Sequence, residues 1–403
     1  MSNSPVTAVL LAAGEGRWLE PLTNRRPKPM VPVANRPLLE HVVETIAAAG
    51  IDRLVIVVGY QQERIRNHFG DGASWDVTIE YVEQATQLGT GHAILQAEPA
   101  VDGPFVVLNG DRVVDPEIVR TICDRVDTGE SPVMAVTAAA QPRDYGVVSL
   151  DGDSVTAIAE KPEGPIETNR INAGVYGFTP AVFDAIRDTH TTGEVTITAT
   201  LNKLAATDEV TAVSYTGRWL DVSNLWDMLA VNAALIGTQS SGADRNDSDG
   251  GQSTNTDRRQ DADSVAVADD VALADDVYIG PNATVGGASA IGRNTTIEAN
   301  AVIENAVIFP DVVIGAGAVV RDAVVASNVA IGPNTTVAGD PATVVVGDRV
   351  HHDVDLGGVI GDNTTVGAGA TVTDGAIVGD DVRASAGVVI DDRVETDSVV
   401  RRG

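Results

Sequence analysis

The last third of the chain carries an apolar residue at every sixth position. The first run comprises Val267, Leu273, Ile279, Val285, Ile291, Ile297, Ile303 and Phe309. This period fits neither an amphipathic helix nor an alternating strand. It is typical of a parallel β-helix, whose flat faces are each about one hexapeptide long. The period slips after Phe309 and resumes at Ile360. We therefore expect a β-helix with an excursion over residues 340–356.

Residues 1–237 alternate between strand-like and helix-like segments. Val6–Ala13, Leu54–Val58 and Phe105–Leu108 are apolar runs of strand length, whereas Leu38–Ala49 and Gln61–His68 have helical patterns. This alternation predicts an α/β, doubly wound, Rossmann-like domain with a parallel sheet. In such sheets, ligands bind at the carboxyl ends of the strands.

Between these two patterns, the chain becomes small and polar. Residues 238–264 contain Ser, Gly, Asn, Gln and Asp and offer almost nothing to bury. Such composition is typical of a flexible acidic linker, and an exposed acidic insertion is the alternative. We thus expect an α/β domain over 1–237, a linker over 238–264 and a β-helix over 265–403.

The charge of the chain limits its partners. Its 57 acidic and 27 basic residues give a net charge of −30, which argues against nucleic acid and anionic membranes as partners. Lysine occurs only at Lys28, Lys161 and Lys203. Few lysines beside many aspartates favour a halophilic protein, and an ordinary acidic protein is the alternative.

Cysteine content and hydropathy indicate the compartment. Cys123 is the only cysteine, so neither a disulfide framework nor a thiolate metal site is expected. No apolar run approaches the roughly 18 residues of a membrane span. The first apolar run leads into glycines and does not resemble a signal peptide. We expect a cytoplasmic protein.

That first apolar run continues as Gly14-Glu15-Gly16-Arg17, and Lys28 follows soon after. Glycine N–H groups can line a concavity for phosphate, and a lysine supplies a compact positive charge. The Gly-Lys-Ser/Thr of a P-loop and the third glycine of a dinucleotide fingerprint are both missing. Two glycines alone would also fit a tight strand-to-helix turn.

The whole stretch from Val9 to Met30, with Arg26-Pro27-Lys28-Pro29 near its end, resembles the signature of the sugar-1-phosphate nucleotidylyltransferases. These enzymes, of class EC 2.7.7, make a nucleotide-sugar and pyrophosphate from a nucleoside triphosphate and a sugar 1-phosphate. The tail resembles the left-handed β-helix of hexapeptide-repeat acyltransferases. Together they resemble archaeal bifunctional nucleotidylyltransferase/acetyltransferases.

The resemblance implies Mg²⁺ as cofactor, with Asp111 and Asp221 as its ligands. Asp111 ends the string Val-Val-Leu-Asn-Gly-Asp, and Asp221 lies in Arg-Trp-Leu-Asp-Val-Ser, where Ser223 replaces the glycine usual in the family. Carboxylates placed after buried strands suit a hard cation that is shared with substrate phosphates. Two anionic substrates need charge neutralisation and positioning more than acid–base catalysis.

The resemblance also assigns the substrate contacts. The nucleotide residues are Leu11, Ala13, Gly14, Gly16, Lys28, Gln84, Gly89 and Thr90. The Gln-Leu-Gly-Thr-Gly-His-Ala string at residues 87–93 looks like that of uridylyltransferases, so UTP or dTTP is expected. The sugar-phosphate residues are Gly146, Glu160, Lys161 and Asn172, from the Tyr-Gly, Glu-Lys-Pro and Asn-x-Gly-x-Tyr motifs. The catalytic residues are Arg17, Lys28 and Lys161.

One departure bears on activity. The family places arginine two residues after the second glycine, where this chain has Trp18, and Arg17 precedes it. Three interpretations stay open: Arg17 reaches the triphosphate, Arg25 or Arg26 compensates, or the domain is a catalytically impaired regulatory paralogue.

The tail carries a second open alternative. His351 and His352 are its only histidines, and they lie in the excursion, outside the Gly-His-x-x-Tyr-like context of family acetyltransferases. We expect a structural tail that drives homo-oligomerisation, to a trimer or a larger assembly. A bifunctional enzyme that also acetylates glucosamine 1-phosphate is the alternative. The sequence does not identify the sugar.

Overall fold

A computed structural model describes residues 6–189, 193–207, 209–243, 264–339, 341–346 and 349–402, without the side chains of 239–243. The chain divides into two compact units. The first comprises residues 1–15, 26–30 and 38–221, and the second comprises 16–25, 31–37 and 222–403. This division differs from a simple cut near residue 237, because residues 222–237 and two short N-terminal segments group with the β-helix.

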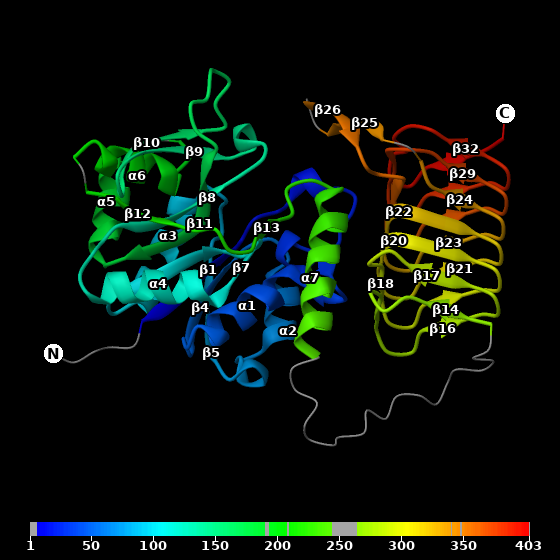
Figure 1. Cartoon of the computed structure of the whole chain (residues 1–403), viewed down its shortest axis with the longest axis horizontal. Helices are drawn as coiled ribbons and strands as arrows, with labels where there is room; N and C mark the ends of the chain where they lie inside the picture. The colour runs from blue at the N-terminus through cyan, green and yellow to red at the C-terminus, as the bar shows by residue number, and fades with distance from the viewer. Residues whose placement is uncertain are drawn as a thin grey trace. The chain divides into compact units, whose positions relative to one another are not determined.

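The first unit is an α/β domain (Figure 1). Its strands are β1 (Thr7–Ala12), β4 (Arg53–Val58), β5 (Thr78–Glu83), β6 (Phe105–Asn109), β7 (Arg112–Val114), β8 (Val133–Ala138), β9 (Gly146–Asp151), β10 (Ser154–Glu160), β11 (Arg170–Phe178), β12 (Thr211–Ser214) and β13 (Trp219–Asp221). Its helices are α1 (Leu38–Ala48), α2 (Gln62–Phe69), α3 (Thr90–Gln96), α4 (Pro116–Asp127), α5 (Ala181–Thr189) and α6 (Ile197–Ala205), with short 3₁₀ turns at Lys28–Met30, Ala73–Trp75, Glu98–Ala100 and Pro142–Asp144.

Nine of these strands form one sheet in the order β5-β4-β1-β6-β11-β8-β12-β10-β9. The expected parallel arrangement is present in β5, β4, β1 and β6, whereas β11 runs antiparallel to both β6 and β8. Gly152 and Asp153 alone connect β9 to β10, and parallel strands need a crossover of a dozen or more residues. These two strands are therefore antiparallel, and the sheet is mixed.

Both faces of the sheet are covered, as a doubly wound fold requires. Alternate residues of a strand point to opposite faces, and both Ala8 and Val9 of β1 are fully buried. Val9 belongs to a core that also contains Ile94 of α3 and Leu201 of α6. On the other side, α4 packs against α1 and against β6, β8 and β11. The apolar run of β1 thus reflects burial on both faces.

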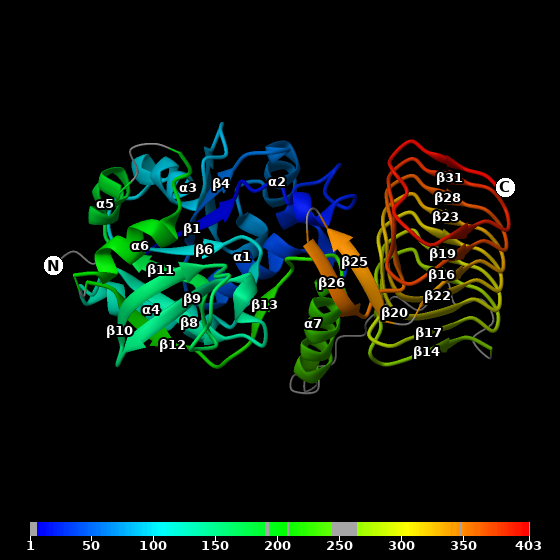
Figure 2. The same ribbon diagram turned by 90° about the horizontal axis from the view of Figure 1, so that it is seen from above.

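The second unit contains the parallel β-helix that the six-residue period predicts. Its coils stack in order along the prism (Figure 2). One face holds β14 (Ala266–Val267), β17 (Thr284–Gly286), the first part of β20 (Val302–Ile308) and of β22 (Val319–Val325), β24 (Thr336–Val337), β29 (Thr371–Val372) and β32 (Val389–Ile390). The second holds β15 (Ala272–Leu273), β18 (Ala290–Ile291), the ends of β20 and β22, β27 (Gly358–Ile360) and β30 (Ala376–Val378). The third holds β16 (Tyr278–Ile279), β19 (Thr296–Ile297), β21 (Val313–Ile314), β23 (Ala330–Ile331), β28 (Thr365–Val366), β31 (Arg383–Ala384) and β33 (Val399–Val400).

The register of the coils explains the pattern in the sequence. Thr284 pairs with Val302, 18 residues later, whereas Val302 pairs with Val319, only 17 residues later. Ile291 likewise pairs with Ile308, 17 residues later, so the period slips between Ile303 and Ile308 and not after Phe309 as the sequence suggested. The expected excursion is a hairpin of β25 (Ala342–Val346) and β26 (Arg349–Val354) (Figure 2).

Corner residues of the coils adopt left-handed backbone conformations. Asn294, Asp311, Asn363 and Asp381 have φ between 55° and 64°, which Asn and Asp tolerate better than other non-glycine residues. Their side chains join successive coils, since the Asn294 amide donates to Asp311 and the Asn363 amide to Asp381. The Asn- and Asp-rich composition of the tail therefore has a structural role.

Three N-terminal or central elements complete the second unit: the 3₁₀ turn Arg17–Leu19, the β2 (Pro32–Val33) and β3 (Arg36–Pro37) hairpin, and α7 (Asp227–Ala243). Asn232 of α7 accepts a hydrogen bond from Ala34 N and donates one to Ala288 O. Helix α7 continues to Ala243, six residues into the expected linker, and residues 244–263 lie outside the described residues. None of the described helices is long and apolar enough to cross a membrane.

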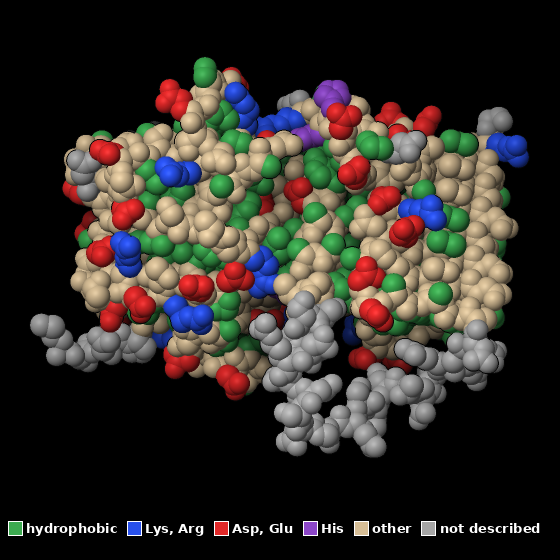
Figure 3. Space-filling view, viewed as in Figure 1, with side chains coloured by type: hydrophobic (Ala, Val, Ile, Leu, Met, Phe, Trp, Pro, Cys, Tyr) green, Lys and Arg blue, Asp and Glu red, His purple; other side chains and the backbone are tan. Residues whose placement is uncertain are grey.

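The surface reflects the composition. On the face shown in Figure 3, acidic side chains are spread over much of the chain and basic side chains are fewer. This distribution agrees with the net charge of −30.

Candidate active site

The carboxyl ends of β1 and β6 bring two predicted regions together. The strands are parallel neighbours, with Leu11 opposite Asn109. Gly110 N donates to Leu11 O, and a Cβ on Gly110 would lie 2.9 Å from that oxygen. Glycine is therefore required for this close approach. The arrangement places Leu11, Ala13 and Gly14 at the same sheet edge as Asp111.

Gln87, which the sequence analysis did not select, joins a third region to this edge. Its side-chain amide donates a 2.7 Å hydrogen bond to Ala13 O. The contact connects the segment after β1 to the segment that contains Gln84, Gly89 and Thr90. An uncharged glutamine in a loop gives no sequence signal for such a role.

The segment around Gly89 is fastened to the residues that precede α6. Gly89 has φ +99°, and a Cβ there would lie 2.6 Å from Val195 O. Thr90 Oγ1 accepts a hydrogen bond from Ile197 N. The buried Gln84 donates to Gly89 O and contacts His92 Nδ1 at 2.9 Å. The Gln84 amide thus holds the loop in this structure.

Four charged side chains form the centre of the site: Lys28, Asp111, Arg112 and Asp221. The Lys28 ammonium pairs with Asp111 Oδ2 and lies 4.0 Å from Asp221 Oδ1. The Arg112 guanidinium pairs with Asp221 and lies 3.9 Å from Asp111 Oδ1. The Asp221 side chain is 1% exposed, so its charge depends on these two cations.

A two-stranded sheet creates this cluster. Strands β7 and β13 are antiparallel, and Asp221 stands directly opposite Arg112 in their register. Burial would raise the pKa of Asp111, but the charges of Lys28 and Arg112 outweigh it and hold that pKa well below its usual range. Asp111 is therefore anionic at neutral pH.

Arg112 is a site residue that the sequence analysis missed. Besides pairing with Asp221, its guanidinium lies 5.3 Å from the centre of the Trp219 ring and 5.9 Å from that of Tyr145. Trp219 Nε1 donates a 2.9 Å hydrogen bond to Ala173 O. Arg112 therefore connects the carboxylates to the predicted sugar-binding segments. Its place directly after Asp111 was the only signal in the sequence.

The predicted sugar-phosphate residues lie on three neighbouring strands. Gly146 and Glu160 are opposite each other in β9 and β10, and a Cβ on Gly146 would lie 2.9 Å from Glu160 Oε2. Asn172 of β11 donates to the Tyr176 hydroxyl and accepts from Gly174 N. A Cβ on Gly174 would lie 2.8 Å from Asn109 Nδ2, which places this turn beside the end of β6.

Glu160 and Lys161 end β10 with opposite charges. Desolvation by surrounding atoms raises the pKa of Glu160, and the charges of Lys161 and Arg112 oppose this rise. Lys161 is exposed, has φ 41° and donates its backbone N–H to Tyr145 O. A positive φ at a lysine is a strained conformation, of the kind that structures retain at functional sites.

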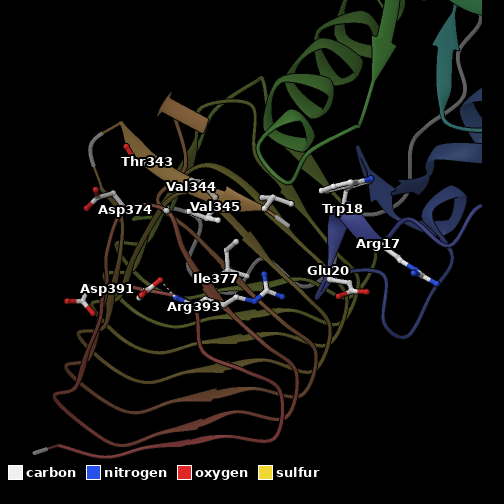
Figure 4. A pocket seen from close by; sticks show the side chains of 13 residues that line it. Arg17, Trp18, Glu20, Thr343, Val344, Val345, Asp374, Ile377, Asp391 and Arg393 are labelled. Atoms are coloured by element: carbon white, nitrogen blue, oxygen red, sulfur yellow. Dashed lines mark hydrogen bonds between the residues drawn. The ribbon is translucent and has the colours of Figure 1, made fainter. Parts of the chain in front are cut away.

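Gly16 and Arg17 belong to the second unit. Gly16 has φ 75° and precedes the 3₁₀ turn Arg17–Leu19. Arg17 and Trp18 line a cavity of about 720 Å³, together with residues of the β25–β26 hairpin and of the last coils (Figure 4). Trp18 is 50% exposed.

The donor set at the centre of the site suits a hard divalent cation. Asp111 and Asp221 supply carboxylate oxygens that converge on one ammonium group. Among the described residues, no group of three or more His, Cys, Asp and Glu could hold a metal ion. Two carboxylates fit Mg²⁺, which usually completes its coordination with water and substrate phosphates.

Comparison with known families agrees with this geometry. Residues 7–237, more than half of the chain, match the Nucleotidyl transferase family. The chain belongs to the nucleotidyl transferase family. Residues 267–357 match a second family, the GMPPB C-terminal domain.

Several curated proteins resemble the nucleotidyl transferase part of the chain. "Bifunctional protein GlmU" of Methanococcus maripaludis is 36% identical over 229 residues, which cover 56% of this chain and 53% of the relative. "Low-salt glycan biosynthesis nucleotidyltransferase Agl11" of Haloferax volcanii is 36% identical over 239 residues, covering 57% and 65%. "Glucose-1-phosphate thymidylyltransferase" of Streptomyces antibioticus is 35% identical, covering 57% and 66%. The chain spans about half the length of the GlmU relatives that it matches.

Two solved structures share the fold of this nucleotidyl transferase. A putative glucose-1-phosphate thymidylyltransferase from Bacillus anthracis superposes with a TM-score of 0.54 at 24% identity, covering 57% of this chain and 94% of the other. A UDP-glucose pyrophosphorylase gives a TM-score of 0.52 at 23% identity, covering 58% and 100%. At these identities the likeness concerns the fold.

Proposed function

We propose that this chain transfers a nucleotidyl group from UTP or dTTP to a sugar 1-phosphate, releasing pyrophosphate and a nucleotide-sugar. The observation that carries the proposal is the cluster of Lys28, Asp111, Arg112 and Asp221 at the carboxyl ends of β1 and β6. Membership of the nucleotidyl transferase family supports the reaction class. The proposal assigns the reaction to residues 1–237 and a structural role to 265–403.

The charges of the cluster suit this reaction. Attack of one anionic phosphate on another needs local positive charge. Asp111 and Asp221 would hold Mg²⁺, which supplies Lewis-acid polarisation of the phosphate oxygens when bound. Lys28, paired here with both carboxylates, would then be available to bind triphosphate oxygens. Arg112 pairs with Asp221 and orients it.

The sugar 1-phosphate would bind between β9, β10 and β11. Glu160 and Asn172 can hydrogen-bond sugar hydroxyls, and a side chain at position 146 would obstruct the Glu160 carboxylate, because a Cβ there would lie 2.9 Å from Glu160 Oε2. The exposed Lys161 would bind the sugar phosphate. These roles follow from the motifs and agree with the common placement of the four residues.

The nucleotide base is proposed to be a pyrimidine. The string around Gly89 resembles that of uridylyltransferases, and one relative is a glucose-1-phosphate thymidylyltransferase. Because the Gln84 amide is engaged by Gly89 O and His92, backbone groups of the Gly89 segment are the proposed contacts of the base.

Pyrophosphate release over a panel of four nucleotides and several sugar 1-phosphates tests the function. We expect release with UTP, dTTP or both, dependent on one sugar 1-phosphate and abolished by a chelator. An absence of release with every pair would contradict the proposal and would favour the regulatory interpretation of Trp18. Activity with purine nucleotides alone would overturn the assignment of the base.

We further propose that the β-helix mediates self-association. Several apolar side chains of its coils are exposed, among them Val389 at 63% and Val399 at 57%. Sedimentation of the full chain at several concentrations tests this, and a monomer at all of them would refute it.

A further inference from the structure

Residues 16–25 form a loop between Gly14-Glu15 and the segment that carries Lys28. We call this loop the nucleotide loop. It belongs to the same compact unit as the β-helix. Two contacts fasten its end to one corner of a coil. Asn24 Nδ2 donates a 2.8 Å hydrogen bond to Asp380 Oδ2, and Arg25 forms an ion pair with Asp381.

Asp380 is a preorganised acceptor. The residue is 2% exposed, and its Oδ1 accepts a 2.7 Å hydrogen bond from Asp362 N of the preceding coil. Asp362 makes the same kind of contact with Ser327 N. One carboxylate oxygen of Asp380 thus accepts a hydrogen bond from the preceding coil, whereas the other accepts one from the loop. Burial raises the pKa of Asp380, and the hydrogen bond from Asn24 opposes that rise.

Asp381 also has two partners. Its Oδ1 accepts from Asn363 Nδ2 at 3.1 Å, as Asp311 accepts from Asn294 elsewhere in the prism. Its Oδ2 pairs with Arg25, in a contact whose side chains are 46% and 32% exposed. Exposed ion pairs contribute little, so the part-buried hydrogen bond of Asn24 to the buried Asp380 is the stronger of the two contacts.

Hydrogen bonds within the loop connect its two ends, so a contact that fixes Asn24 also restrains Gly16. Thr23, which is 3% exposed, donates its hydroxyl to Gly16 O at 2.9 Å. Leu19 N also donates to Gly16 O, and Leu22 N donates to Leu19 O. A displacement of Asn24 would therefore be transmitted to Gly16 and Arg17.

Trp18 indicates which part of the chain the loop packs against. It stands where the nucleotidylyltransferase signature has arginine, and it lines the cavity that residues 343–346 of the hairpin also line (Figure 4). The side chain at this position thus lines a cavity within the β-helix unit. The departure from the signature is consistent with a loop that is held from that unit.

We infer that Asp380 and Asp381 are positioning residues, through which the β-helix sets the conformation of the nucleotide loop by way of Asn24 and Arg25. The inference rests on the proposed nucleotidyl transfer. It gives the tail a role in the reaction of the same chain, separate from any acyl transfer.

The test compares Asn24→Ala, Asp380→Asn and the double variant in the full chain. Asp380→Asn retains an oxygen for Asp362 N but presents an amide to that of Asn24. We expect each single variant to raise KM for the nucleotide about tenfold and to change KM for the sugar 1-phosphate less than about twofold. The double variant should resemble the single ones, because the residues act through one contact.

Asp311→Ala is the matched control. It removes a corner carboxylate that accepts from Asn294 but has no described contact with the loop, so its nucleotide KM should equal that of the wild type. Asp381→Ala should raise the nucleotide KM by about threefold, since its ion pair is exposed. Thermal unfolding of every variant measures any loss of β-helix stability, and Asn24→Ala changes the loop without altering a coil.

The possible outcomes distinguish the proposed function from the inference about the loop. A wild type that releases no pyrophosphate overturns the proposed function and this inference with it. An active wild type whose nucleotide KM is unchanged in Asn24→Ala and Asp380→Asn overturns only the inference. Multiplied effects in the double variant would also overturn it, because Asp380 would then act through the prism alone. Equal increases in KM for the nucleotide and for the sugar 1-phosphate would also overturn the inference.

Discussion

Asp221 stands directly opposite Arg112 in the register of β13 and β7, although the two residues are more than a hundred positions apart in the chain. The pairing puts a carboxylate with 1% exposure beside a guanidinium with 14% exposure. Asp111, next to Arg112 in the sequence, is thereby brought to the same point, and Lys28 pairs with both carboxylates. A short two-stranded sheet thus assembles the charged centre of the site.

Asp111→Asn and Asp221→Asn should each abolish turnover, because each removes an anionic ligand from a hard cation. Their effects on stability should differ. Asp221→Asn removes the closest charged partner of the largely buried Arg112 and should lower the free energy of unfolding by about 3 kcal/mol, whereas Asp111 is more exposed and its loss should cost less. Pyrophosphate release and urea unfolding measure the two effects. Wild-type kcat in either variant at saturating Mg²⁺ would refute that metal assignment.

Arg112→Met should make the protein unusually responsive to Mg²⁺. Without the guanidinium, Asp221 lacks its strongest partner, and metal-free stability should fall by about 3 kcal/mol. Millimolar Mg²⁺ should restore part of this loss, so its effect on Tm should exceed that in the wild type. Arg125→Met, which removes a surface pair with Glu130, is the control. An equal Mg²⁺ response in all three proteins would argue against a metal at Asp221.

Lys28→Ala and Lys161→Ala should separate by substrate. Loss of Lys28 should weaken nucleotide binding, and loss of Lys161 should raise KM for the sugar phosphate. One charged hydrogen bond contributes about 1.5–3 kcal/mol, so each change should be tenfold or more. Lys203, which donates to Asp188 O, is the third lysine of the chain, and Lys203→Ala should leave both constants unchanged. Identical kinetic profiles for Lys28→Ala and Lys161→Ala would refute this division of roles.

The β-helix could be predicted in detail because one apolar residue in six marks each face. Val285, Ile291 and Ile297 are buried, as the period requires, whereas Leu273 in the first coil is 39% exposed because the end of the prism lacks a neighbour. The slip that was expected after Phe309 lies before it, because Ile308 and not Phe309 pairs with Ile291. The excursion is a hairpin. The six-residue period can be recognised from residues close together in the chain, so the sequence predicts the β-helix.

The grouping of residues 16–25 with the β-helix could not be predicted. It depends on Asn24 and Asp380, which lie 356 positions apart. In the sequence, each looks like an ordinary polar turn residue, and nothing there indicates that Asp380 is buried. The antiparallel half of the sheet was missed for a related reason. Strand pairing between β11, β8 and β9 is set by tertiary neighbours, which short apolar runs do not specify.

The histidines of the hairpin bear on the alternative of a second activity. The His351 ring centre lies 4.8 Å from that of Trp226, and His352 Nδ1 lies 3.2 Å from Thr343 Oγ1. Both residues are on β26, outside the coils of the prism. An acetyltransferase base has to reach the amine of its acceptor, and packing against Trp226 instead gives His351 a structural role.

We therefore expect no acetyl transfer from acetyl-coenzyme A to glucosamine 1-phosphate. Thiol release with the full chain should equal the rate without protein, and His351→Ala and His352→Ala should leave pyrophosphate release at its wild-type rate. His351→Ala should lower stability by about 1 kcal/mol, since it removes a contact between aromatic rings. Acetyl transfer that disappears in either histidine variant would instead establish a bifunctional enzyme. In that case the catalytic base would lie on β26, which is not part of the six-residue repeat.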